Sequence, residues 1–253
     1  MGYNKVIKSA KTLETYTYEK QLPFRPRTRR SISRKTSLSG MASHGSTTLR
    51  QDEFKEKRRD NARCASLVFR RLVSANLDGT HHPLLIAFTY AENETSLKTG
   101  YKDFGAFIQA LRYKFGKQFR YIAVPEFQTR GAVHFHALFW GLPDTITQEE
   151  RHSRLVAGIW GHGYVDVIQT DGDQRISSYL AKYMAKAFTD HRLMGQKAYT
   201  RSRNLIKPEI VSGIGNYGLE ALLEEIGVDN PEIDKTYDTL RLGKGRHRIY
   251  KLD

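Results

Sequence analysis

Short hydrophobic runs begin at about residue 82 of the chain and change their period several times before residue 190. Buried apolar runs and alternation with a period of two predict strands, whereas apolar residues at helical spacing predict helices. These patterns predict strands over residues 84–90, 121–127, 133–140 and 164–168, and helices over residues 103–115, 149–160 and 176–188. Strands and helices therefore follow the order β-α-β-β-α-β, with one more helix after them.

This order of elements predicts an α+β fold. A central antiparallel sheet of ferredoxin-like or split βαβ (RRM-like) topology accommodates it, with the helices packed on the sheet. A turn containing Gly131 joins the strands over 121–127 and 133–140, so we expect these two strands to form a hairpin. The chain holds no Gly-x-x-x-x-Gly-Lys-Ser/Thr phosphate loop, which argues against ATP-driven unwinding.

The two ends of the chain are basic and carry weaker patterns. Residues 21–36 contain no acid, and a segment of this kind repels itself and buries little surface, so we expect residues 1–50 to form a basic flexible N-terminal arm. Residues 51–81 read as a basic helical segment, residues 82–200 as the compact domain, and residues 201–253 as a basic C-terminal extension with a short helix over 219–226. Cations that we expect to contact DNA in the first two segments are Arg25, Arg27, Arg29, Arg30, Lys57, Arg58 and Arg59.

Composition indicates a nucleic-acid partner. The 253 residues include 41 Lys and Arg against 27 Asp and Glu, a formal net charge of +14, and polyphosphate is the commonest match for such a surplus. The alternative is a soluble protein with a merely basic surface. Cys64 is the only cysteine, which excludes an internal disulfide and a cysteine-based zinc site. No apolar run approaches the ~20 residues of a membrane helix, so we expect a soluble, cytoplasmic protein with no membrane partner.

The segment 131–140 places two histidines two residues apart on an apolar strand. Alternate side chains share a face of a strand, so His134 and His136 point the same way. If residues 129–131 form a three-residue loop, Glu126 lies directly opposite His134 and joins that face; a two-residue loop would turn Glu126 to the other face. Two imidazoles and a carboxylate suit Mn²⁺ or Mg²⁺ acting on phosphate, and the same ligands also serve zinc. The alternatives are hydrogen-bonded core histidines and a solvated glutamate.

The helix over residues 176–188 carries a second group of chemical side chains. Tyr179, Lys182, Tyr183 and Lys186 share one helix face, whereas Leu180, Ala181, Met184 and Phe188 fall on the other side. A tyrosine held away from the core beside ammonium groups is suited to act as a nucleophile, because positive charge favours the phenolate and holds a phosphate. The alternative is a basic DNA-contacting helix whose tyrosines only stack.

Together these features resemble the HUH endonucleases, in particular the two-tyrosine rolling-circle replication initiators of small single-stranded DNA phages and plasmids. The motifs of that family occur here in the same order, as Phe88-Thr89, His134-Phe135-His136 and Tyr179 to Lys186. The resemblance covers about residues 82–190. One departure is Val133, where such proteins often have proline.

The resemblance implies a role for each matching residue. His134 and His136 are then metal ligands with Glu126 as the upstream acidic ligand, Tyr179 and Tyr183 are nucleophiles, and Lys182 and Lys186 contact phosphate. Each tyrosine has a lysine three residues later, so the order in which the tyrosines attack stays open. Residues 82–200 are then the endonuclease domain, acting on single-stranded DNA or an origin stem-loop with a host helicase and a DNA polymerase as partners.

Two rival functions use the same residues differently. A transposase or conjugative relaxase would use the metal and tyrosine for strand transfer between molecules. A non-catalytic ferredoxin-like module would instead bind nucleic acid by stacking Phe135, Phe139 and Trp140 on bases. Strand alternation places Phe135 and Phe139 opposite the histidines, where we expect helix packing, and Trp140 on the histidine face.

Overall fold

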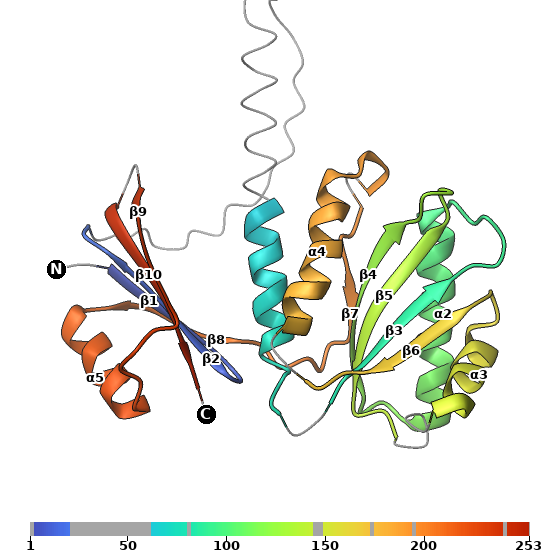
Figure 1. Ribbon diagram of the computed structural model, residues 1–253, viewed down its shortest axis with the longest axis horizontal. Helices are drawn as coiled ribbons and strands as arrows, with labels where there is room; N and C mark the ends of the chain where they lie inside the picture. The colour runs from blue at the N-terminus through green and yellow to red at the C-terminus, as the bar shows by residue number, and fades with distance from the viewer. Residues whose placement is uncertain are drawn as a thin grey trace, which may run out of the picture.

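The computed structural model describes residues 3–20, 62–79, 82–143, 149–172, 175–193, 196–239 and 242–252. These residues form two five-stranded antiparallel sheets with helices packed against them (Figure 1). The expected α+β class is therefore confirmed. The second sheet was not expected.

The first sheet has the strand order β6-β3-β5-β4-β7. Its first four strands are the order 4-1-3-2 of a ferredoxin-like sheet, as the sequence predicts, and β7 adds a short edge strand. The elements follow the chain as β3 (Leu84–Thr89), α2 (Leu97–Phe115), β4 (Arg120–Phe127), β5 (Val133–Trp140), α3 (Glu149–Trp160), β6 (Val165–Gln169), α4 (Arg175–Thr189), the 3-10 turn η2 (His191–Leu193) and β7 (Thr200–Arg201).

Helices cover both faces of this sheet. On one face α2 and α3 pack an aromatic core in which Phe88 meets Phe104, Phe107 and Trp160 edge to face. On the other face, the helix over residues 62–74 and α4 pack on Leu85, Leu138 and Trp140, among others (Figure 1). Both faces are therefore buried, and the histidine face of β5 is the one that α4 covers.

Helix α2 begins at Leu97, six residues before the predicted start at Asp103. Ser96 caps it, because its side chain accepts a hydrogen bond from the backbone N–H of Thr99 at 3.3 Å. A Cβ at Gly100 would lie 2.9 Å from a methyl group of Val133, so the first turns lie very close to β5. Glycine there weakens the helical pattern in the sequence while permitting the close packing.

The second sheet joins the two ends of the chain in the order β8-β1-β2-β10-β9. Helix α5 packs on one of its faces through Leu219, which meets Val6, Leu13 and Tyr250 of the strands (Figure 1). The elements are β1 (Tyr3–Ser9), β2 (Thr12–Tyr18), β8 (Glu209–Ile214), α5 (Asn216–Ile226), β9 (Ile233–Thr239) and β10 (Gly243–Lys251).

This sheet corrects the expected flexible arm over residues 1–50. Residues 3–18 contain β1 and β2, two of the three inner strands of the second sheet, because Val6 and Leu13 are buried against partners from the far end of the chain. Residues 21–50 lie outside the described residues. Most of the C-terminal extension is likewise folded into strands and α5, and the helix over residues 62–74 is the described part of the basic helical segment.

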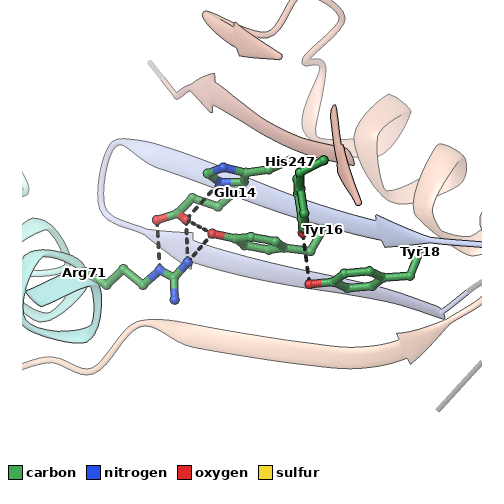
Figure 2. Close-up of polar contacts among 6 residues, drawn as sticks. Glu14, Tyr16, Tyr18, Arg71 and His247 are labelled. Carbon is green, nitrogen blue, oxygen red and sulfur yellow. Dashed lines mark hydrogen bonds and ion pairs between the residues drawn. The ribbon is translucent and has the colours of Figure 1, made fainter. Parts of the chain in front are cut away.

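A buried ion pair ties the second sheet to the helix over residues 62–74. Arg71 on this helix donates to both carboxylate oxygens of Glu14 on β2, at 3.0 and 2.6 Å, and also to the hydroxyl of Tyr16 (Figure 2). Tyr16 in turn donates to Glu14, and His247 lies 3.3 Å from the same carboxylate. Burial by itself raises the pKa of Glu14, but hydrogen bonds from His247 and Arg71 and the charge of Arg71 lower it well below its usual range.

Replacing this glutamate should destabilise the protein strongly. Glu14→Gln leaves the Arg71 guanidinium buried without a counter-charge, which costs about 3–5 kcal/mol of unfolding free energy. Because the folded pKa of Glu14 is depressed, the ion pair contributes fully above about pH 4.3, the usual pKa of a free glutamate, and less as the pH falls. Urea unfolding at pH 7 and at pH 3 should therefore show a large difference between wild type and Glu14→Gln at pH 7 that shrinks at pH 3. The exposed Glu209, changed to Gln, is the control; an equal loss at both pH values would contradict this role of the carboxylate.

Candidate active site

The β4–β5 hairpin places an acidic residue beside the histidine pair. Gln128 donates its backbone N–H to the carbonyl of Ala132, and Gly131 takes the left-handed conformation at φ 89°, so the loop holds three residues. The register pairs Glu126 directly with His134, as the three-residue loop predicts. Glu126, His134 and His136 therefore share the sheet face that α4 covers.

The side chains of this trio make specific contacts. His136 Nε2 lies 3.1 Å from Glu126 Oε2, and the two histidine rings are 4.6 Å apart between centroids. His134 Nδ1 lies 2.9 Å from the hydroxyl of Thr89 on β3. When Nδ1 carries the proton and donates it to Thr89, Nε2 of His134 keeps the lone pair that a cation requires. Thr89 lies in the first of the three sequence motifs, but the motif alone indicates no role for it, because only the β3–β5 pairing shows that it faces His134.

The electrostatic environment favours the ligand forms of His134 and Glu126. Burial and the neighbouring His136 together lower the pKa of His134 to about 4, against the opposing charge of Glu126, so His134 is neutral at neutral pH. The hydrogen bond from His136 and the ion pair with Lys186 lower the pKa of Glu126 to about 2 against the opposing effect of burial. A neutral imidazole and an ionised carboxylate are the forms that bind metal ions.

The donor set fits a divalent ion in kind. The 3.1 Å between His136 Nε2 and Glu126 Oε2 is close to the ~3 Å that separates two ligands at right angles around an ion about 2.1 Å away. Within the ranges that the structure describes, however, no three His, Cys, Asp or Glu side chains are placed so that they could hold an ion as they stand. The second carboxylate oxygen of Glu126 accepts a hydrogen bond from Lys186 at 2.7 Å.

Helix α4 brings the tyrosines to this group. The ring of Tyr183 stacks on His136 with centroids 3.7 Å apart and planes 22° apart. The hydroxyl of Tyr183 donates to the hydroxyl oxygen of Tyr179 at 2.7 Å, and Lys186 Nζ lies 5.2 Å from the Tyr183 ring centroid. Two elements far apart in the sequence, the β4–β5 hairpin and α4, therefore meet in one cluster of polar side chains.

The two faces of α4 are divided as the sequence predicts, with one difference. Leu180 and Ala181 are buried, whereas Tyr179 and Lys182 are exposed; the side chains of Met184 and Phe188 lie outside the described ones. The difference is Tyr183, which is half-buried and packs partly against the core because its ring lies on His136.

The expected effect of the lysines on the phenolate does not appear at Tyr183. Burial raises the pKa of this phenol, and the hydrogen bond to Tyr179 and the charge of Glu126 raise it further. Lys186, expected to contact phosphate, is instead engaged with Glu126. That contact has no signal in the sequence, because the two residues lie on different elements 60 positions apart.

One family model matches the part of the chain that holds this site. Residues 83–188 match the model of the replication-associated protein ORF2/G2P family. No curated protein and no solved structure matches the chain. The matched segment runs from β3 to α4 and so contains the histidine strand and the tyrosine helix, and it supports a role in DNA replication with DNA as the partner.

The described helices include none with the length and apolar character that a membrane crossing requires.

Of two further sets of predicted residues, the structure describes one. The rings of Phe135, Phe139 and Trp140 are buried, at most 1 % exposed, so they do not form a stacking surface for bases. This removes the observation on which the non-catalytic stacking module depended. The other set lies outside the described residues; it consists of the seven cations predicted to contact DNA, which are Arg25, Arg27, Arg29, Arg30, Lys57, Arg58 and Arg59.

Proposed function

We propose that the protein initiates rolling-circle replication by nicking single-stranded DNA with a tyrosine and remaining joined to the 5′ end. The observation that carries this proposal is the contact between the two halves of the site, the ring of Tyr183 stacked on His136 beside Glu126. A tyrosine pair that served only as packing would not need two histidines and an ionised glutamate at its edge. The family match over residues 83–188 supports the same role.

The proposed reaction exchanges one phosphoester bond for another, so it requires neither an oxidant nor a nucleotide. The phenol oxygen of one tyrosine forms a bond to the scissile phosphorus as the bond from phosphorus to the DNA 3′ oxygen breaks. The phenol loses its proton and the 3′ oxygen gains one, which gives a 5′-phosphotyrosine and a free 3′-hydroxyl. A divalent ion held by His134, His136 and Glu126 would neutralise charge on the phosphate and position it.

The geometry favours Tyr179 as the first nucleophile. Its side chain is 38 % exposed, whereas Tyr183 is covered by its stack on His136. The hydroxyl of Tyr183 donates a hydrogen bond to the hydroxyl oxygen of Tyr179, and such a bond favours negative charge on the accepting oxygen. Tyr183, from the same helix face, would then attack the regenerated junction in the second step.

Lys186 has a second place to act in this scheme. Its ammonium pairs with Glu126 in the structure, and its exposed side chain has the reach and charge to bind a DNA phosphate instead. Transfer of Lys186 from Glu126 to phosphate would free the second carboxylate oxygen for the ion. Lys186 would thus remain paired with the Glu126 carboxylate until DNA binds.

The test is a covalent-adduct assay with single-stranded oligonucleotides tiled along both strands of the DNA that encodes the protein. With Mn²⁺ present, an oligonucleotide labelled at its 3′ end should yield a labelled protein band that resists denaturation. The same oligonucleotide labelled at its 5′ end should release a shorter fragment that a polymerase can extend. A chelator should abolish both products. Retention of the 5′ label on the protein, or an equal adduct yield in chelator, would contradict the proposal.

A further inference from the structure

The second sheet presents a group of tyrosines and lysines on the face opposite α5. Alternation along each strand and the registers of β1, β2, β9 and β10 place these side chains on one face, in two adjacent rows across the sheet. We name this group the tyrosine face; its members are Tyr3, Lys5, Tyr16, Tyr18, Lys235 and Tyr237. Helix α5 packs on the other face, where Val6, Leu13 and Tyr250 lie.

Contacts among the tyrosines hold their rings in place. Tyr237 donates its hydroxyl to that of Tyr18 at 3.1 Å, and the two rings meet edge to face at 6.3 Å. A Cβ at Gly245 would lie 2.8 Å from the Tyr237 ring, so the ring lies closely over the glycine backbone. Tyr3 lies 6.0 Å from Tyr18, and Tyr16 on the next row is drawn beside Tyr18 in Figure 2. Rings ordered in this way lose little conformational entropy when a flat partner stacks on them.

The charges of the sheet are divided between its faces. Of the acidic residues in its five strands, only Glu14 points to the tyrosine face, and Arg71 neutralises it. The other three, Glu209, Asp234 and Asp238, point to the α5 face by the same alternation. Lys5 and Lys235 flank the aromatic rings on the tyrosine face. This face is therefore positively charged and aromatic, the combination that binds single-stranded nucleic acid without strong sequence preference.

We propose that the tyrosine face binds single-stranded DNA, with bases stacked on Tyr18 and Tyr237 and phosphates beside Lys5 and Lys235. This inference rests on the proposed function for its biological meaning, since a nicking enzyme needs a surface for the strand next to the cut. The ion pair between Glu14 and Arg71 ties this face to the helix that packs on the first sheet. DNA on the tyrosine face would thus be tethered to the domain that carries the histidines.

The test measures binding of oligodeoxythymidine of about 20 nucleotides to the full chain by fluorescence anisotropy in the presence of chelator. All variants carry Tyr179→Phe/Tyr183→Phe so that no covalent adduct forms. Tyr237→Leu should weaken binding about fivefold or more, because the stacking surface is lost, while Tyr237→Phe keeps the ring and most of the affinity. Tyr217→Leu is the matched control, since Tyr217 is an 85 % exposed tyrosine on α5. Equal affinity of Tyr237→Leu and the control would overturn the inference.

A second measurement protects the test against a variant that unfolds. This measurement uses protein with no tyrosine-face substitution and an oligodeoxythymidine that carries one iodouracil. When their complex is irradiated, crosslinks should form to peptides that contain Tyr16, Tyr18 or Tyr237. Crosslinks confined to residues 84–201 would overturn the inference. The proposed nicking function is tested separately by the adduct assay with Mn²⁺, so loss of one result leaves the other readable. Binding to the tyrosine face without any adduct would contradict the nicking function alone.

Discussion

Tyr179→Phe/Tyr183→Phe protein should form no covalent adduct with DNA, a loss of at least about 10³-fold in nicking rate, because phenylalanine has no oxygen to attack the phosphorus. The rings themselves remain, so the stack of residue 183 on His136 and the fold of α4 should persist. Adduct yield on the cleaved oligonucleotide, read after denaturing electrophoresis, measures the effect. The thermal unfolding midpoint should stay close to that of wild type.

The single variants separate the two tyrosines. Tyr179→Phe should abolish the first nick, whereas Tyr183→Phe should still nick and fail to transfer the strand in the second step. Tyr113→Phe is the control, since Tyr113 is a 97 % exposed tyrosine on α2. Full adduct formation by the double variant would mean that another residue is the nucleophile. A first nick that survives in Tyr179→Phe but not in Tyr183→Phe would reverse the proposed order.

His136→Ala should abolish cleavage while leaving DNA binding nearly unchanged. His136 contacts Glu126 through Nε2 and Tyr183 through its ring, so its removal takes away a metal ligand and the support of a tyrosine together. Removal of a metal ligand or of the group that positions a nucleophile costs about 10²-fold or more in rate. Single-turnover cleavage with saturating Mn²⁺, together with anisotropy in chelator, measures the two effects separately.

Control variants exclude a general loss of structure. His162→Ala removes a partly exposed histidine outside the cluster and should cleave normally. Because His136 is 8 % exposed, its replacement leaves a small cavity, and Glu126→Gln provides a second variant that keeps side-chain volume. Glu126→Gln should also lose cleavage, since the amide binds a divalent ion less well than the carboxylate. Normal cleavage by both His136→Ala and Glu126→Gln would rule out the metal site.

The position of Glu126 could be predicted because it depends on local geometry. A loop of three residues with Gly131 at the left-handed position determines the register of the hairpin, and the register determines the face of Glu126. The face of α4 is likewise a matter of angle along one helix. Local periodicity also predicted the order of the elements from β3 to α4, and the strand order β6-β3-β5-β4 is the one that a ferredoxin-like connection of these elements gives. The short edge strand β7 was not predicted.

The second sheet could not be predicted in the same way, because its strands pair across almost the whole chain. β2 pairs with β10, and each strand alone is short and rich in polar residues, so neither shows a strong apolar pattern. The contacts of Tyr183 and Lys186 were missed for a related reason. The stack on His136 and the ion pair with Glu126 depend on how α4 packs on the sheet. The periodicity of the helix predicts which residues share a face, but it does not predict how far that face lies from the β4–β5 hairpin.

The pairing of β2 with β10 has a consequence during synthesis of the protein. A ribosome adds about 5–20 residues per second, so the β1–β2 hairpin leaves the exit tunnel on the order of ten seconds or more before β10 exists. During that interval both edges of the hairpin are open to pairing with other chains, a hazard of unprotected strands. The elements of the first sheet, which follow one another closely in sequence, can fold in the meantime. Nascent chains arrested after residue 201 would therefore carry a formed histidine hairpin beside an unpaired N-terminal one, and crowded polysomes would be where such chains associate.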